Sequence, residues 1–145
     1  MAIDLRRLAT ILKVITYLTR IGRYGKDIAS VVEELSQKRP YPALFLNLQH
    51  MMEHVKSMVI DALKAFENSD TKYIENFKER DNEIDEMRWS IFRECLTYMM
   101  EDAKNITPCS FFAIIARYLE RCGDNACKIA EKVHYMVTGE HIEIS

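Results

Sequence analysis

Apolar and polar positions alternate with the period of an α-helix along nearly the whole chain. The pattern begins in residues 3–37, where apolar side chains recur every three or four positions on one broad face. These side chains are Ile3, Leu5, Leu8, Leu12, Ile15, Leu18 and Ile28. Three later segments with the same period, at about 43–67, 71–104 and 107–138, predict three further helices, and no stretch shows the alternation typical of a β-strand.

Residues that end or begin helices lie between these segments. Pro40 and Pro42 in "QKRPYPA" predict the end of the first helix, because proline lacks an amide donor and restricts the residue before it. Ser69 or Asp70 is expected to cap the third helix. Thr107 is expected to cap the fourth, with Pro108 in its first turn and Gly139 just beyond its end.

The fold class follows from these segments. The longest of these helices exceed 30 residues and are therefore about 50 Å long at 1.5 Å per residue. Short connections make neighbouring helices antiparallel. We therefore expect an all-α protein, an elongated antiparallel bundle of four long helices that forms a single domain over residues 1–145.

Composition narrows the range of functions. The 145 residues are 48% hydrophobic and 29% charged, with a formal net charge of −2, so no basic field is available to recruit nucleic acid. No apolar run approaches the roughly 20 residues that span a bilayer, and the first residues do not resemble a signal peptide. Four cysteines without a CxxC pair are expected to be reduced thiols. Together these features predict a cytoplasmic protein.

Acidic side chains interrupt the apolar stripes of the third and fourth helices. Asp81 takes an apolar position in the stripe of the third helix, and Asp85 lies one turn later on the same face. Glu120 and Asp124 repeat the arrangement on the fourth helix. If the two helices form a hairpin around residues 105–108, the two acidic pairs lie at nearly the same level, and we expect the four carboxylates to meet.

Four converging carboxylates need positive charge, because repulsion and burial both raise the pKa of such groups. A metal ion that prefers oxygen ligands would supply that charge. Arginine is the other candidate, and Arg88, Arg117 and Arg121 lie close in sequence to the acids. The residue pattern leaves both alternatives open.

A segment of the fourth helix has a relative in the first. "LTRIGRYGKDIA" (18–29) and "LERCGDNACKIA" (119–130) share Leu, Arg, Gly, Ile and Ala at an offset of 101 residues, and a tyrosine precedes each segment. Thr19 and Arg23 stand where the later segment has Glu120 and Asp124. Only the later segment therefore carries the acidic pair.

Three stretches carry a resemblance to the PhoU family of phosphate-uptake regulators. They are "RYLERCGDNACKIAEKVHYMVTGEH" (117–141), "DLRRLATILKVITYLTRIGRYGKDIA" (4–29) and "KERDNEIDEMRWSIFRECLTYMMEDAKNI" (78–106). The usual family member has two three-helix repeats. The resemblance implies that residues 1–37 form the last helix of a first repeat and that residues 43–138 form a complete second repeat.

The resemblance also implies a site and a function. Acid-xxx-acid motifs of the family hold iron, zinc, manganese or magnesium, which suggests a divalent or trivalent metal at Asp81, Asp85, Glu120 and Asp124. Arg88, Arg117 and Arg121 would then support the site, and Arg23 could serve as an internal counter-ion. The implied function is a non-enzymatic regulator that docks on the ATPase of a phosphate ABC transporter and on a sensor kinase.

Further expectations concern assembly. The regulator would reach the membrane only through its partner, and its first helix could pack onto the second repeat or pair with its copy in a homodimer. The alternative function is a metal-free helical adaptor that has lost the regulatory site.

Two shorter motifs suggest other chemistry. "HMMEH" (50–54) matches the HxxEH pattern of zinc peptidases, but the chain offers no evident third ligand for His50 and His54. Glu131 and His134 form one ExxH unit, whereas di-iron centres of four-helix bundles need two such units. Both motifs are therefore read as ordinary bundle residues.

Overall fold

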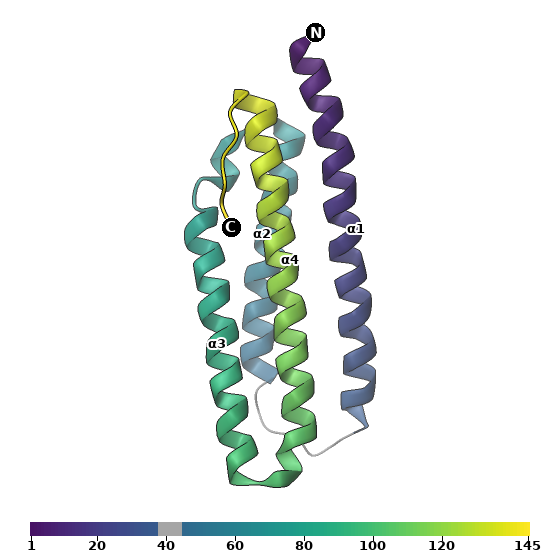
Figure 1. Cartoon of the computed structure of the whole chain (residues 1–145), viewed down its shortest axis with the longest axis vertical. Helices are drawn as coiled ribbons and strands as arrows, with labels where there is room; N and C mark the ends of the chain where they lie inside the picture. Colours follow the sequence, from purple (N-terminus) through teal and green to yellow (C-terminus); the bar gives the residue numbers. More distant parts are fainter. Residues whose placement is uncertain (38–44) are drawn as a thin grey trace.

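The computed structural model describes residues 1–37 and 45–145. Its α-helices are α1 (Ala2–Ser36), α2 (Phe45–Asn68), α3 (Phe77–Glu101) and α4 (Ile106–Thr138). Two short 3₁₀ helices, η1 (Thr71–Ile74) and η2 (Ala103–Asn105), lie before and after α3. The described residues contain no strand, and the helices run alternately up and down the long axis of the molecule (Figure 1). The expected all-α, elongated antiparallel bundle is confirmed.

Helix α4 is the centre of the bundle. It packs against α1, α2 and α3, while α1 has its main contacts with α4 alone and lies at one edge of the molecule (Figure 1). The sequence of α4 fits this central position, since several of its faces carry small and apolar residues. Among them are Ala126, Ala130 and Val133, which are fully buried. A helix that is apolar nearly all round is the kind that a bundle can enclose.

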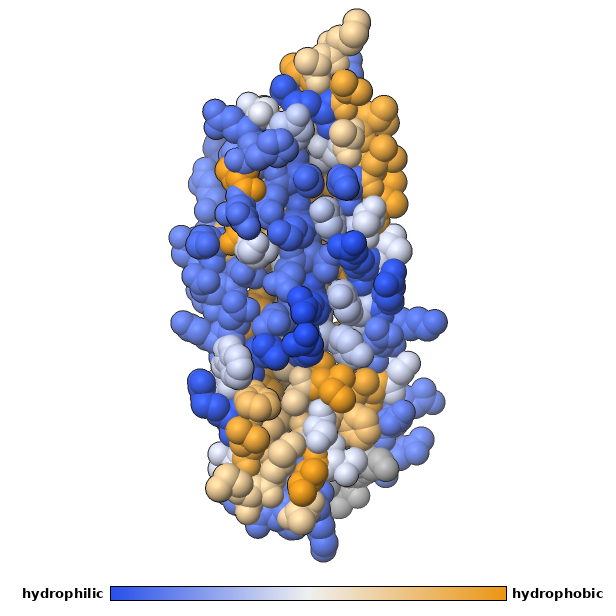
Figure 2. All heavy atoms as spheres, viewed as in Figure 1, coloured by the Kyte–Doolittle hydropathy of each residue, from blue (hydrophilic) through white to orange (hydrophobic). Residues whose placement is uncertain are grey.

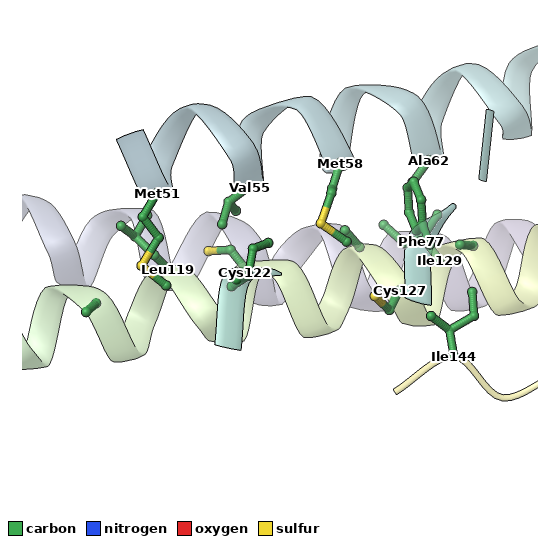
Figure 3. Packing of buried hydrophobic residues seen from close by; sticks show 14 of the residues in the cluster. Met51, Val55, Met58, Ala62, Phe77, Leu119, Cys122, Cys127, Ile129 and Ile144 are labelled. Atoms are coloured by element: carbon green, nitrogen blue, oxygen red, sulfur yellow. The ribbon is translucent and has the colours of Figure 1, made fainter. Parts of the chain in front are cut away.

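The core lies between α2, α3 and α4. In Figure 3, Met51 of α2 lies beside Leu119 of α4 and Val55 lies beside Cys122. Further along α2, Ala62 lies beside Phe77 of α3 and Ile129 of α4. Ile144, beyond the end of α4, folds back onto the same core. Each fully buried large side chain contributes about 1.5–3 kcal/mol relative to an exposed one. This packing fixes the position of α3 against α4.

The face by which α1 packs differs from the expected one. Its inner face is a second stripe at helical spacing: Thr10, Val14, Tyr17, Ile21, Tyr24, Ile28, Val31 and Leu35, which are buried or half-buried. The Thr10 hydroxyl donates to the carbonyl of Lys132, 3.5 Å away, and the rings of Tyr24 and Tyr118 are 5.9 Å apart. Of the stripe seen in the sequence, Leu18 and Ile28 are half-buried, while the other five members are exposed.

Helix ends differ slightly from the sequence expectations. Asp70 caps η1 by accepting from the amide of Lys72, and α3 itself begins only at Phe77. Helix α4 begins at Ile106, so Thr107 lies inside it. Gly139 ends α4 in the left-handed conformation, φ 77°, as expected. The stop at Pro40 and Pro42 lies outside the described residues.

None of the helices in the described part of the chain has the length and hydropathy needed to cross a bilayer.

Candidate functional site

The four predicted acids lie on the facing sides of α3 and α4. Asp81 and Asp85 come from α3, and Glu120 and Asp124 come from α4. Ile84, between the two acids of α3, packs over Gly123, where an added Cβ would lie 3.2 Å from the Ile84 Cδ1 atom. This close contact sets the register of the two helices.

The register brings the acids level because the hairpin turns at η2, residues 103–105, rather than at residues 105–108. Asp102 caps this turn by accepting from the amide of Lys104 at 2.9 Å. The turn therefore lies midway in sequence between Ile84 and Gly123, so the acidic pairs on either side of these two residues lie at the same level.

Asp81 is the most buried of the four acids. It is 7% exposed, and its Oδ1 atom is buried without a hydrogen-bond partner among residues 1–37 and 45–145. Burial raises the pKa of Asp81, and the charges of Asp85 and Glu120 raise it further, while a hydrogen bond from the Cys127 thiol opposes the shift. An unpaired buried carboxylate oxygen is costly. The Oδ1 atom of Asp81 is therefore the carboxylate oxygen of this cluster that a nearby positive charge would stabilise most.

Glu120 and Asp124 each have an arginine partner. Arg88 of α3 lies 3.3 Å from Glu120, and Arg121 lies 3.4 Å from Asp124. The pKa of Glu120 is nevertheless raised, mainly by burial, with Arg88 lowering it and Asp85 raising it. The pKa of Asp124 is raised by burial and by Asp81, against the effect of Arg121. Two arginines therefore do not fully compensate four carboxylates.

The other predicted cations stand apart from the cluster. Arg117 is exposed on α4 and lines a shallow recess with Arg88 and Phe92. Arg23 is exposed on α1. Within residues 1–37 and 45–145, neither Arg23 nor Arg117 forms an ion pair with any of the four acids. The counter-ions that the structure brings to the acids are Arg88 and Arg121.

The donor set suits a metal that prefers oxygen ligands, although the side chains do not stand ready to bind it. The cluster offers only carboxylate oxygens, one of them buried and unpartnered. As the side chains stand, no three His, Cys, Asp or Glu residues of the described segments are close enough together to hold an ion. Glu120 is instead paired with Arg88, and Asp124 with Arg121.

The two shorter motifs have ordinary contacts. The rings of His50 and His54 are 5.3 Å apart, and His54 lies 3.5 Å from Glu83. Glu131 lies 3.3 Å from Lys128, and His134 contacts the carbonyl of Glu140. Among the described residues, neither motif belongs to a group of three side chains that could hold a metal ion.

Two residues of the site are absent from the sequence expectations. Gly123, which admits Ile84, could have been noticed because the segments 18–29 and 119–130 share a glycine at this position. The second residue is Cys127, one turn beyond, whose thiol lies close enough to Asp81 to lower the pKa of that carboxyl group. All four cysteines are free and buried, and burial keeps Cys127 protonated by raising its pKa.

These features define an elongated helical-bundle protein with an acidic cluster buried between two long helices. Residues 48–133 match the family model described as the PhoU domain, and the chain belongs to the PhoU family. The family resemblance of the sequence is thereby confirmed.

Relatives with curated names cover nearly the whole chain. It is 38% identical over 142 residues to the phosphate-specific transport system accessory protein PhoU homolog of Caulobacter vibrioides, covering 98% of this chain and 62% of that protein. The homolog of the same name from Rhizobium meliloti is 37% identical, covering 96% of this chain and 59% of that protein. The chain thus spans about three fifths of the length of these relatives.

A solved structure agrees with the fold. The crystal structure of PhoU from Pseudomonas aeruginosa superposes with a TM-score of 0.91 at 34% identity, covering 97% of this chain and 67% of that one.

Proposed function

We propose that this protein is a non-enzymatic, cytoplasmic regulator of phosphate uptake that docks on the ATPase of a phosphate transporter and on a sensor kinase, and so meets the membrane only through its partner. The relatives are named as accessory proteins of a phosphate-specific transport system, which supports the transport role. In this proposal, α1 is the last helix of a first repeat and α2 to α4 form a complete second repeat.

The regulatory site in this proposal is the acidic cluster between α3 and α4. The observation that carries it is the Oδ1 atom of Asp81, which is buried and has no hydrogen-bond partner in the described part of the chain, among carboxylates with raised pKa values. Asp81 and Asp85 would hold a metal from α3, and Glu120 and Asp124 from α4. A bound divalent or trivalent cation (iron, zinc, manganese or magnesium) supplies positive charge that relieves carboxylate repulsion and joins the two helices.

Arg88 connects this cluster to the surface of the molecule. Its guanidinium lies 3.3 Å from Glu120 and, on its other side, 5.2 Å from the ring centroid of Trp89. If the four carboxylates held a cation, Glu120 would no longer need Arg88 as its partner, and the Arg88 guanidinium would be free to pair at the neighbouring surface. The charge presented beside Trp89 would then depend on whether a cation is bound.

That surface is apolar and exposed, and we propose it as the docking face. Large side chains gather over the lower part of α3 and α4 (Figure 2). They are Trp89, Phe92, Leu96, Met100, Ile106 and Ile114, between 41% and 88% exposed. Exposed apolar groups gathered in this way are typical of protein-binding sites, where aromatic residues and arginine supply most of the affinity.

The test is binding of the whole chain to the purified ATPase of a phosphate transporter, with manganese(II) or with EDTA. We expect manganese(II) to change the affinity at least tenfold, and Trp89→Ala to weaken binding in either condition. Ile60→Ala, a control at a 41% exposed position of α2, should bind normally. Loss of the manganese effect in Glu120→Gln would support the link through Arg88. Binding that is indifferent to both manganese and Trp89→Ala would contradict the proposal.

The metal-free adaptor is a second candidate. It is favoured by the ion pairs of Glu120 with Arg88 and of Asp124 with Arg121, and by the lack of a ready three-ligand group among the described residues. Elemental analysis of protein purified without chelator separates the two functions. Substoichiometric metal, together with thermal stability unaffected by EDTA, would favour the adaptor.

We also propose that the regulator is a homodimer, a proposal that the apolar face of α1 left exposed in the described part of the chain supports.

A further inference from the structure

A polar recess of about 390 Å³ lies between the middle of α1 and the middle of α4. Three cationic side chains line it, Arg20 from α1 and Arg121 and Lys128 from α4, and Tyr24, Asp124 and Asn125 lie beside them. The volume falls within the range of roughly 300–1,000 Å³ that is usual for pockets that hold small molecules. Because cations predominate in the lining, the recess favours a small anion.

Two of these cations occupy the same position in the internal repeat. At the offset of 101 residues, Arg20 corresponds to Arg121, and the same offset further along relates Val32 to Val133. The arginine is thus present in both copies, whereas the acids that flank it on α4 have no counterparts on α1. Pairing with an acid at those positions therefore does not account for Arg20.

The packing of α1 on α4 brings the two arginines together. The helices lie side by side and run in opposite directions (Figure 1). Thr10 contacts Lys132, and Tyr24 contacts Tyr118, so the two residue numbers of each pair add up to 142. This register places Arg20 level with residue 122 and Arg121 level with residue 21. The two arginines therefore lie at the same level, and both reach the recess.

The two cations of α4 already have partners. Arg121 lies 3.4 Å from Asp124. Lys128 lies 3.3 Å from Glu131 and 3.4 Å from a main-chain oxygen of Ser145. These contacts leave Arg20 as the cation of the recess with the most unused capacity for an anion.

Arg20 is exposed, and its guanidinium lies 5.6 Å from the ring centroid of Tyr17. Within residues 1–37 and 45–145 it forms no ion pair. Among the lining side chains, Asp124 is the carboxylate that stands against Arg20, Arg121 and Lys128. The lining therefore has an excess of positive charge.

From this arrangement we infer that the recess binds the phosphate group of a small molecule. Arg20 and Arg121 hold the phosphate oxygens from two helices, because the planar set of donors on a guanidinium matches the geometry of an oxyanion. Lys128 adds positive charge at the edge of the recess. A phosphate group carries close to two negative charges at pH 7, which suits several converging cations better than a carboxylate does.

Calorimetric titration of the whole chain, in EDTA and at low ionic strength, tests the site with two probes, inorganic phosphate and adenosine monophosphate. We expect a dissociation constant below about 1 mM for at least one of them. Binding of inorganic phosphate would identify the free ion as a ligand, and binding of adenosine monophosphate alone would identify a phosphate monoester. A wild type that binds neither probe would overturn the inference.

Arg20→Gln should weaken binding at least tenfold, because it removes charge-assisted hydrogen bonds to the anion. It should leave the fold intact, since Arg20 is exposed. Arg117→Gln removes the same charge from an exposed position of α4 outside the recess and should leave binding unchanged. Equal weakening by the two substitutions would reduce the effect to net charge and overturn the site.

Asp124→Asn gives a second test, with the opposite sign. Asp124 competes with the anion for Arg121 and repels a phosphate group bound beside it. Its replacement by asparagine should therefore tighten binding at least threefold in EDTA, a gain that a damaged fold would not produce. Weaker or unchanged binding in Asp124→Asn would contradict the position of the phosphate group beside Arg121.

The phosphate site goes beyond the proposed function and does not depend on a bound metal. Arg20→Gln leaves the four acids and Arg88 in place, so manganese(II) should still raise the melting temperature of this variant. A chain that manganese(II) stabilises but that binds neither probe would overturn the phosphate site alone. Phosphate binding in a chain that manganese(II) does not stabilise would overturn the metal site alone.

Discussion

Helices α1 and α4 share a repeated segment, yet they sit in opposite surroundings. The segment of α4 lies in the middle of the bundle with helices on several sides, and it carries the acidic pair. The matching segment of α1 lies at the edge, packs mainly on α4, and has Thr19 and Arg23 in place of the acids. The comparison indicates that a buried carboxylate pair needs a facing helix that brings a second pair. On α1, where none of the described helices covers that face, Thr19 and Arg23 take the place of the acids.

Substitution of the glycine shared by the two segments should give the largest difference in stability between them. Gly123→Leu forces a side chain into Ile84, and such overpacking costs about 3 kcal/mol. Gly22→Leu meets open space and should stabilise the monomer slightly, since leucine is a better helix former than glycine. Urea unfolding of both variants, at a concentration where the wild type is monomeric, measures the difference. Equal destabilisation would show that the two glycines have the same surroundings.

A second matched pair uses the shared valine. Val133→Ala removes two buried methyl groups and should cost about 2 kcal/mol. Val32→Ala makes the same change at a 47% exposed position and should cost less than about 0.5 kcal/mol in the monomer. If Val32→Ala proved as costly as Val133→Ala under monomeric conditions, the outer face of α1 would have to be covered within one chain.

The sequence predicts the acids between α3 and α4, but it does not predict how α1 packs. The acids of α3 and α4 could be found because Asp81 and Glu120 interrupt apolar stripes, and a charge among apolar residues is a strong signal. The face by which α1 packs could not be found, since Val14 and Leu12 belong to two stripes of the same helical period. The helical period of apolar positions identifies an apolar face, but it does not identify the element that covers this face. The sequence also does not predict the turn at η2, because Asp102 lies in a segment whose pattern predicts one continuous helix.

The acidic cluster should respond to loss of a single charge. In metal-free protein at pH 7, Asp81→Asn removes a buried carboxylate that burial, Asp85 and Glu120 all oppose. We expect it to raise the free energy of unfolding by on the order of 1 kcal/mol, because burying a neutral amide costs less than burying a charged carboxylate. Leu12→Asn, a control on α1, should change it little. Destabilisation by Asp81→Asn would show that the negative charge of Asp81 is better compensated in the folded protein than its contacts indicate.

The smallest effect concerns pH. Because the pKa of Asp81 is higher in the folded protein than in the unfolded chain, protonation of Asp81 favours folding. Its favourable contribution is complete below the ordinary aspartate pKa and is lost as the pH rises through the raised value. The stability advantage of metal-free Asp81→Asn should therefore shrink as the pH falls from 7 toward 4. Thermal unfolding of both proteins across this range measures it, and an advantage that grew in acid would have the wrong sign.

The measurement that tests the central claim most directly is thermal unfolding of chelator-treated protein titrated with manganese(II). The account predicts that the melting temperature of the wild type rises with the cation concentration, because a ligand that binds only the folded state stabilises it. The double variant Asp81→Asn/Glu120→Gln should start from a stable metal-free state and show no rise. Identical curves for wild type and double variant, or a wild type that manganese does not stabilise at all, would contradict a metal-binding role for the four carboxylates.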